Sequence, residues 1–179
     1  MLAIADDLTG ALEAGAKFAV AGLSSVVLAD DSAAPDADVV VLDTETRHVA
    51  ADDAERRVAS RAAGLSAPLI YKKTDSTLRG NIEAEFRALG RVYPEARIAY
   101  VPAYPALGRT VRGERLFIDG VPAHDTCFAR DPLNPIRDNS VRAAAGPHCE
   151  IFDGETQDDI RRAANRIIDE RFKIFAGPA

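Results

Sequence analysis

Short apolar runs alternate with longer amphipathic segments along most of the chain. The runs are rich in Val and Ile and do not alternate strictly with polar residues, which is typical of strands buried on both faces of a sheet. We expect strands at Leu2–Ala5, Ser25–Ala29, Val39–Leu42, Leu69–Tyr71, Ile98–Val101, Leu116–Ile118, Glu150–Phe152 and Lys173–Phe175. Strands separated in this way predict an α/β fold with an open, mostly parallel sheet.

The segments between the runs carry apolar residues at helical spacing. The apolar stripes are Leu12, Ala16, Ala19 and Leu23; Ala54, Val58 and Ala62; Ile82, Phe86 and Leu89; and Ile160, Ala164 and Ile167. Thr156 and Asp159 have the spacing of a capping box at the start of the last of these segments. Because helices alternate with strands, we expect helices on both faces of the sheet, which gives three layers.

The stretch from Pro102 to Pro135 breaks the alternation. It contains five prolines and three glycines, and Arg109 and Arg112 give it positive charge. We expect a long excursion with one short strand in it. Excursions of this length inside a compact domain are often functional, but an ordinary rigid surface loop is an equal alternative.

Length, charge and cysteine content narrow the class of protein. A chain of 179 residues suits one domain, and a net charge of −6 argues against a general nucleic-acid or anionic-membrane surface. An anionic ligand would therefore need a local group of Lys and Arg. The two cysteines make no disulfide framework, the first residues lack the features of a signal peptide, and no stretch reaches the roughly 20 apolar residues of a membrane span. We expect a cytoplasmic protein.

Two adjacent carboxylates, Asp6 and Asp7 in the stretch ADDLTG, follow the first predicted strand. In open α/β sheets, ligands bind outside the carboxyl ends of the strands. Carboxylates at that place can hold sugar hydroxyls, hold a metal or act as a base. Helix capping would explain one of the two, but adjacent like charges repel, which favours a functional interpretation of the pair.

A second polar stretch, KKTDSTLRGN, follows the predicted strand at Leu69–Tyr71. Lys72, Lys73 and Arg79 bring three positive charges close together, and Asp75 and Ser76 add hydrogen-bonding groups. Such a stretch at a strand end, before a helix, predicts an anion site that suits a carboxylate. The alternative is a solvated basic loop.

Arg47, in the stretch DTETRH after the third predicted strand, is a candidate carboxylate clamp. We interpret the neighbouring His48 as a surface residue. Lys17 lies on a predicted helix away from these stretches and serves as a reference position. The sequence contains no P-loop, no dinucleotide fingerprint, no zinc-ligand spacing and no nucleophile elbow, so no metal site is expected in it.

In this order along the chain, IADDLTGA, DTETR, KKTDSTLRGN and VPAYPALGRTV…LFIDGVP…FARDPLNP resemble the four-carbon acid sugar kinases, which phosphorylate threonate, erythronate or 3-oxo-tetronate. The resemblance implies contacts to the sugar acid from Asp6, Asp7, Arg47, Lys72, Asp75, Ser76, Arg79, Asn81 and Arg109. The catalytic base stays open among Asp6, Asp7 and Asp75, since an Asp suits phosphoryl transfer.

The resemblance also implies a two-domain enzyme that binds the sugar acid in its first domain and ATP with Mg²⁺ in its second. We expect residues 1–179 to be the first, sugar-acid-binding domain, with the ATP-binding domain absent or separately encoded, so that the chain alone turns over no ATP. Homo-oligomerisation is open. One alternative is a sugar-acid-binding module without catalysis. Another is a dehalogenase-like phosphatase, which the sequence disfavours because Leu8 occupies the place of that family's second Asp.

Overall fold

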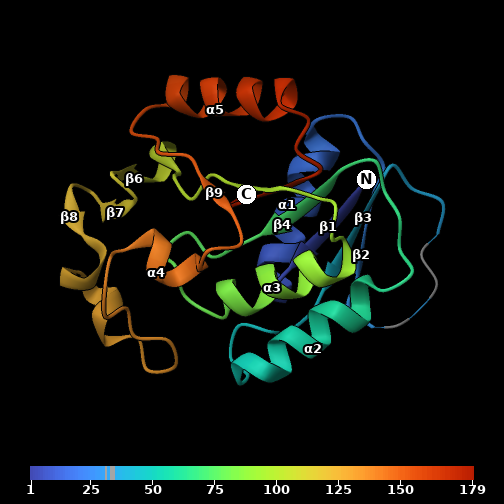
Figure 1. Ribbon diagram of the computed structural model, residues 1–179, viewed down its shortest axis with the longest axis horizontal. Coiled ribbons are helices and arrows are strands. Elements are labelled where there is room, and N and C mark those ends of the chain that lie inside the picture. The colour runs from blue at the N-terminus through green and yellow to red at the C-terminus, as the bar shows by residue number, and fades with distance from the viewer. Residues whose placement is uncertain (31, 33–34) are drawn as a thin grey trace.

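Parallel strands form the central sheet of the protein (Figure 1). The computed structural model describes residues 1–30, 32 and 35–179. Within these residues the sheet has seven strands in the order β2-β3-β1-β4-β10-β5-β9. In chain order they are β1 (Leu2–Ala5), β2 (Ser25–Leu28), β3 (Val39–Asp43), β4 (Ile70–Lys73), β5 (Ile98–Tyr100), β9 (Glu150–Ile151) and β10 (Ile174–Gly177). Every pairing between them is parallel, which confirms the predicted sheet.

Helices cover both faces of the sheet, as predicted. The helices are α1 (Leu8–Val20), α2 (Ala51–Ala62), α3 (Ile82–Val92), α4 (Val141–Ala145) and α5 (Gln157–Asp169). Alternate residues of β1 face opposite sides, because side-chain direction alternates along a strand. Ile4 belongs to a core with Val58 of α2 and Phe86 of α3, whereas Ala3 belongs to a second core with Ala11 of α1. A third core joins α5 to β5.

The apolar stripe expected on the first helix does not face the sheet. Leu12 is 54% exposed, and the buried face of α1 is instead made of small residues. They are Gly10, Ala11, Ala14 and Gly15. A Cβ atom at Gly15 would lie 3.1 Å from Cγ2 of Val27, so small residues let this helix approach the sheet closely. Hydrophobicity alone therefore identified the wrong face.

The apolar stripes predicted on the other helices agree better with the burial observed in the structure. Ala54, Val58 and Ala62 of α2 are fully buried, and so are Phe86 and Leu89 of α3. On α5, Ile167 is buried but the predicted Ala164 is exposed and Ala163 takes its place. The capping box of Thr156 and Asp159 at the start of α5 is present in both directions.

The excursion after β5 contains more regular structure than the single strand expected. The strands β6 (Arg109–Arg112), β7 (Arg115–Ile118) and β8 (Val121–Pro122) form a three-stranded antiparallel sheet among the described residues. Short 3₁₀ turns η1 (Pro105–Leu107), η2 (Ala123–Asp125) and η3 (Cys127–Arg130) flank it. Val111 and Leu116 are fully buried in the main core, so this small sheet is packed onto the domain. Only the strand at Leu116–Ile118 was expected, because Gly108, Gly113 and Gly120 divide this segment into strands of two to four residues.

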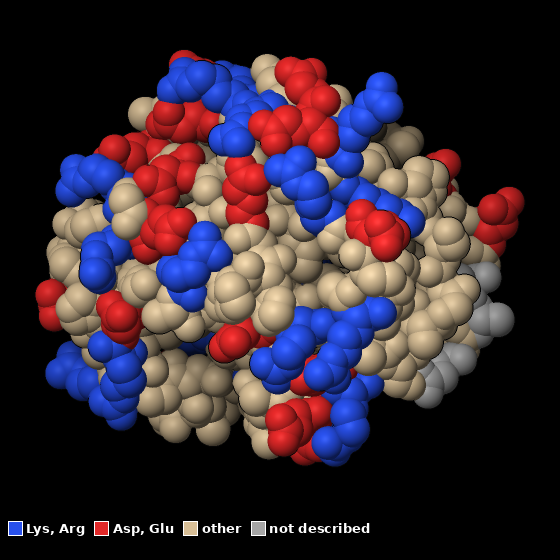
Figure 2. All heavy atoms as spheres, in the orientation of Figure 1, with Lys and Arg blue, Asp and Glu red and all other residues tan. Residues whose placement is uncertain are grey.

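The surface has mixed charge. On the face shown in Figure 2, Lys and Arg are interspersed with Asp and Glu over most elements. Such a surface is unlike the single-sign patches that attract polyanions. No helix in the described part of the chain is long and apolar enough to span a bilayer.

Candidate functional site

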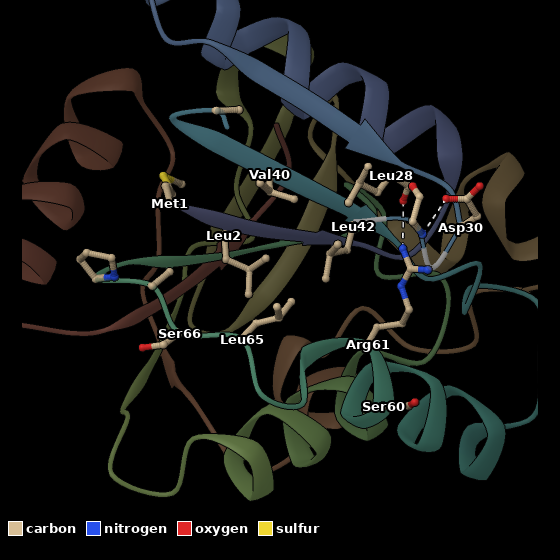
Figure 3. Close-up of a pocket in the computed structure, with 14 residues that line it drawn as sticks. Met1, Leu2, Leu28, Asp30, Val40, Leu42, Ser60, Arg61, Leu65 and Ser66 are labelled. Carbon is tan, nitrogen blue, oxygen red and sulfur yellow. Dashed lines mark hydrogen bonds between the residues drawn. The ribbon is translucent and has the colours of Figure 1, made fainter. Parts of the chain in front are cut away.

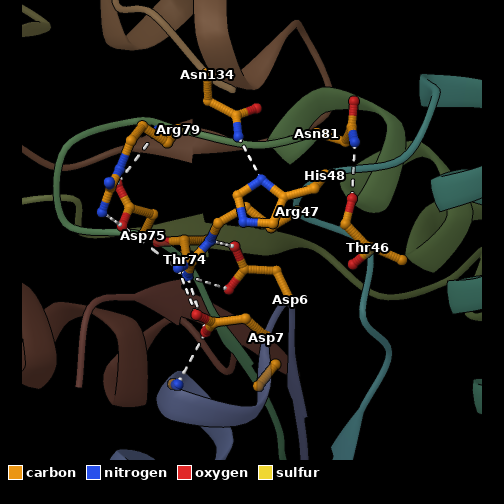
Figure 4. A network of polar contacts seen from close by, with 12 residues as sticks. Asp6, Asp7, Thr46, Arg47, His48, Thr74, Asp75, Arg79, Asn81 and Asn134 are labelled. Atoms are coloured by element: carbon orange, nitrogen blue, oxygen red, sulfur yellow. Dashed lines mark hydrogen bonds and ion pairs between the residues drawn. The ribbon is translucent and has the colours of Figure 1, made fainter. Parts of the chain in front are cut away.

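The polar stretches singled out in the sequence meet at the carboxyl edge of the central sheet (Figure 4). Arg47, which follows β3, lies between the aspartates that follow β1 and β4. Its Nε is 2.7 Å from Oδ2 of Asp6, its Nη1 is 2.5 Å from Oδ2 of Asp7, and its Nη2 is 3.9 Å from Oδ1 of Asp75. These four residues therefore come together at one edge, whereas Lys72, which was expected to converge with them, is buried against Glu85.

Arg47 holds both adjacent carboxylates in a fork. It donates two hydrogen bonds to Asp6 and two to Asp7. Burial would lower the pKa of Arg47, but the hydrogen bond and charge of Asp6 raise it above its usual value. This arrangement explains how two adjacent aspartates coexist at a buried strand end. It also leaves Arg47 engaged with protein carboxylates, so its main role is to organise the site.

Asp7 has a second role at the start of α1. Its Oδ1 accepts a hydrogen bond of 2.8 Å from the backbone N–H of Gly10. The capping alternative therefore holds for one of the two aspartates, alongside the ion pair. A Cβ atom at Gly10 would lie 2.7 Å from Oδ1 of Asp7 and 3.1 Å from Nζ of Lys73. The glycine of ADDLTG is required because the first turn of α1 lies so close to these two groups.

Asp75 is a fixed anion in the loop after β4. Its Oδ2 accepts hydrogen bonds from the backbone N–H groups of Thr77 and Arg79, and its Oδ1 is 2.8 Å from Nη2 of Arg79. Burial alone would raise the pKa of Asp75, but the hydrogen bonds from Arg79 and Thr77 and the charges of Arg79 and Arg47 lower it far below its usual value. A carboxylate held this way is a poor proton acceptor, which argues against Asp75 as a general base.

Arg79 connects the site to the excursion. Its Nη1 lies 3.0 Å from Oδ2 of Asp131, and its guanidinium lies 5.3 Å from the centre of the Phe128 ring. A second contact joins the excursion to the loop after β3, where Nδ2 of Asn134 is 2.6 Å from Nδ1 of His48. The hydrogen bond to Asp75 raises the pKa of Arg79 further, so Arg79 stays charged.

The two lysines of KKTDSTLRGN face opposite sides of the sheet. Lys72 is fully buried, and its Nζ lies 3.0 Å from Oε2 of the equally buried Glu85 on α3. Lys73 points to the α1 side, where its Nζ lies 3.7 Å from Oε2 of Glu13. The buried position of Lys72 argues against the direct ligand contact expected of it. Lys73 was counted among the three cations of the predicted anion site but not among the contacts to the acid, and it lies on the other face of the sheet from Lys72.

Two further expected residues have structural partners. Asn81 donates hydrogen bonds from Nδ2 to the carbonyl oxygens of Thr46 at 2.8 Å and Val49 at 2.9 Å, which fixes the loop that carries Arg47. Arg109 donates from Nη1 to the carbonyl oxygen of Leu107. Asn81 therefore acts on the site indirectly, by holding the loop that carries Arg47.

A small polar cavity of about 180 Å³ lies at this edge. Its lining residues are Asp7, Thr9, Gly10, Glu13, Arg47, Lys73, Asp75, Ser76, Arg79, Tyr104, Leu107 and Pro178. The expected residues that line it are Asp7, Arg47, Asp75, Ser76 and Arg79. Asp6, Lys72, Asn81 and Arg109 are not part of its lining. The lining also includes Lys73, which was expected among the cations of the anion site, and Glu13 and Tyr104, which sequence reasoning missed.

Lys73 has the loosest ion pair of the three cations that line this cavity. Arg47 and Arg79 each have a carboxylate within 2.8 Å, whereas Glu13 is 3.7 Å from Lys73 and is 40% exposed. The Lys73 ammonium also donates to the carbonyl oxygen of Thr74 at 3.0 Å. An ammonium at the wall of a small cavity, with a weak partner, can bind an incoming carboxylate without breaking a strong internal pair.

Lys17 is closer to the site than its position in the sequence indicates. Its Nζ donates to the hydroxyl oxygen of Tyr104 at 3.1 Å, and Tyr104 lines the cavity. The hydrogen bond raises the pKa of Lys17. The choice of Lys17 as a reference away from the site was therefore wrong, because the excursion folds back onto α1.

Larger cavities lie elsewhere. One of them, of about 450 Å³, lies between α2 and the strands β1, β2 and β3, and its lining is mainly apolar (Figure 3). None of the expected site residues lines it. We choose the smaller cavity as the candidate site because the charged groups converge there, although the other cavity has the greater volume.

One further carboxyl group near the edge has an altered acidity. Burial, and to a smaller extent the nearby carboxylates of Glu45 and Asp7, raise the pKa of Asp43 to about 6. Asp43 ends β3 and accepts a hydrogen bond from the backbone N–H of Glu45 at 3.1 Å. Among the described residues, no group of three or more His, Cys, Asp or Glu side chains is placed to hold a metal ion.

Residues 1–150 match the family described as the sugar-binding N-terminal domain. A D-threonate kinase of Salmonella typhimurium is 39% identical over 160 residues, which make up 84% of this chain and 37% of that protein. A D-erythronate kinase of Heliobacterium modesticaldum is 36% identical over 147 residues, covering 77% of this chain and 34% of that protein. The chain thus spans little more than a third of the length of these curated relatives.

A solved structure has the same fold. It is a domain of unknown function from Bordetella bronchiseptica, crystallised with bound citrate as a domain-swapped dimer. The TM-score is 0.88 with 28% sequence identity, over 99% of this chain and 54% of that one. The architecture described above therefore corresponds to about half of that longer chain.

Proposed function

The chain belongs to the family of the sugar-binding N-terminal domain, and on this premise we propose that it binds a four-carbon sugar acid in the polar cavity at the carboxyl edge of its sheet. In this proposal the chain is the substrate-binding part of an ATP-dependent kinase. The curated relatives are named as kinases of D-threonate, D-erythronate and 3-oxo-tetronate, which supports this substrate class.

The observation that carries the proposal is the loosely paired ammonium of Lys73 in the wall of this cavity. In our proposal Lys73 receives the carboxylate of the acid, since charge-assisted hydrogen bonds are the strongest available to a small anion. Arg79 and Ser76 also line this cavity, and in our proposal the guanidinium and the hydroxyl complete the anion site. Asp7 and Asp75 offer carboxylate oxygens as acceptors for the hydroxyls of the acid.

Asp6, Asp7 and Asp75 differ in their suitability as the catalytic base. Asp75 is held ionised by Arg79 and Thr77, and Asp6 is 2% exposed and does not line the cavity. Asp7 lines the cavity directly. Arg47 and the backbone N–H of Gly10 hold the oxygens of Asp7 in the same way, so hydrogen bonding does not single out Asp7 and the catalytic base stays open.

Phosphoryl transfer itself is proposed only for the longer protein. ATP and Mg²⁺ are the donor and metal that a kinase of this class would use, but the described residues include no P-loop and no group placed to hold a metal. The chain's own residues do not fit either group. We propose that the nucleotide is bound by the remaining part of proteins such as the relatives, and that this chain alone binds the acid without turning over ATP.

Chemical-shift mapping tests where the acid binds. D-Threonate added to the ¹⁵N-labelled chain should shift the backbone amide signals of Gly10, Ser76 and Arg79 in a saturable way. Shifts confined to the region around the apolar cavity between α2 and β1, β2 and β3, at Leu28, Leu42 and Leu65, would show that the chosen cavity is wrong. A spectrum that D-threonate leaves unchanged up to tens of millimolar would refute the substrate class.

A further inference from the structure

One wall of the cavity comes from the excursion, and the proposed contacts to the acid leave it unused. Tyr104 and Leu107 line the cavity from the turn VPAYPALG, which includes η1. Apart from Gly10 and Pro178, the other lining residues carry charged or hydroxyl-bearing side chains. An aromatic ring and a leucine at the edge of a polar cavity add little attraction for a sugar acid, so their effect on the ligand is one of shape.

The turn holds these two side chains in one place. The backbone N–H of Tyr104 donates to the carbonyl oxygen of Arg109 at 2.8 Å, and that of Arg109 donates back at 3.1 Å. Gly108 has a φ angle of 71°, in the left-handed region, and a Cβ atom there would overlap the side chain of Asp119. Pro105 occupies the first position of η1 and fixes its own φ angle.

Tyr104 is also tied to α1. Its hydroxyl oxygen accepts the hydrogen bond from Lys17, whose Nζ lies 5.7 Å from the centre of the Tyr104 ring. The turn therefore holds the backbone of Tyr104, and Lys17 of α1 holds its hydroxyl. Moving it to admit a larger ligand would break the Lys17 contact and disturb a closed turn.

We propose that Tyr104 and Leu107 form the wall that limits the length of the acid, so that the cavity accepts a four-carbon acid and disfavours acids of five or six carbons. This inference rests on the proposed function. The cavity of about 180 Å³ is well below the roughly 300–1,000 Å³ of pockets for drug-sized ligands, and in this proposal an additional carbon with its hydroxyl extends towards the side that Tyr104 and Leu107 occupy. The charged walls bind the acid, and this wall selects its length.

Affinity ratios test the proposal. The dissociation constants of D-threonate, D-ribonate and D-gluconate are measured by ligand-observed NMR for the parent chain, Tyr104→Ala, Tyr104→Phe and Leu107→Ala. In the parent, D-ribonate should bind about tenfold more weakly than D-threonate, the discrimination that a single added carbon typically gives. Tyr104→Ala and Leu107→Ala should each lower this ratio severalfold, whereas Tyr104→Phe, which keeps the ring, should retain most of it.

The matched control is Leu133→Ala, at a leucine that is 67% exposed and outside the cavity lining, which should leave the ratio unchanged. Leu107 is itself 50% exposed, so its variant tests the wall even if Tyr104→Ala does not fold. If the parent binds D-threonate and Leu107→Ala keeps the parent ratio, the wall does not select length and this inference is overturned alone. If the parent binds none of the three acids, the proposed function falls and this inference falls with it.

Discussion

Lys72 and Lys73 are neighbours in the chain, yet their ammonium groups lie on opposite faces of the central sheet. Nζ of Lys72 lies 3.0 Å from Oε2 of Glu85 on α3, whereas Nζ of Lys73 lies 3.7 Å from Oε2 of Glu13 on α1. The cause is the alternation of side chains along β4. One lysine is therefore enclosed in the core, and the other lies at the wall of a polar cavity.

The two lysines should respond differently to removal. Lys72→Ala should lower the free energy of unfolding by about 3–5 kcal/mol, because it leaves the carboxylate of Glu85 buried without its partner. Lys73→Ala should cost only about 1 kcal/mol, since Glu13 is 40% exposed and water can solvate it. Urea unfolding followed by circular dichroism measures both.

A double variant serves as the control for this difference. Lys72→Met combined with Glu85→Leu should recover most of the stability lost in Lys72→Ala, because no unpaired charge remains in the core. Equal unfolding free energies for Lys72→Ala and Lys73→Ala would contradict the assignment of the two side chains to opposite faces.

Arg47 should be necessary for the stability of the paired aspartates. In Arg47→Ala, Asp6 and Asp7 lose their shared counter-ion, so the free energy of unfolding at pH 7 should fall by about 3–5 kcal/mol. Arg47→Lys should restore only part of the deficit, because one ammonium cannot form the double fork. Urea unfolding of the three proteins measures the deficit, and equal stability of the parent and Arg47→Ala would contradict the account.

Asp43 should weaken the fold as it ionises. Its pKa is raised from 3.8 to about 6, so the stabilising, protonated form is present at low pH and is lost as the pH rises through 6. Asp43→Asn should therefore match the parent near pH 4 and exceed its unfolding free energy at pH 7.5, by an amount on the order of 1–2 kcal/mol after allowance for solvent screening. Chemical denaturation at the two pH values measures this. A constant difference between the two proteins would show that Asp43 does not titrate as described.

Local patterns in the sequence were sufficient for the parallel sheet, for helices α2 and α3, and for the position of the polar stretches at one edge. Local patterns were insufficient where the burial of a residue depends on the element that packs against it. The buried face of α1 is made of Gly and Ala rather than Leu12, because β2 and β3 approach it closely. Likewise, with both faces of β4 buried, no polarity pattern could tell Lys72 from Lys73.

The excursion is a second region in which local sequence patterns could not predict which residues reach the site. Tyr104 reaches the cavity only because a long segment folds back onto α1, where Lys17 binds it. Neither residue carries a local signal for this contact. By contrast, Asp6, Asp7 and Arg47 could be brought together from the sequence, since each follows a strand of one parallel sheet.

The direct test of the account is a calorimetric or NMR titration of D-threonate into the parent chain, Lys73→Ala and Arg112→Ala. Arg112 is an exposed cation outside the cavity lining, so its removal controls for a change in net charge. We predict weak binding to the parent, with a dissociation constant between about 0.1 and several millimolar, given the few heavy atoms of the ligand. Lys73→Ala should weaken this binding about tenfold or more, the loss expected for a charge-assisted hydrogen bond, and Arg112→Ala should not. Equal affinity of the parent and Lys73→Ala for D-threonate would contradict the claim that this cavity binds the carboxylate of the acid.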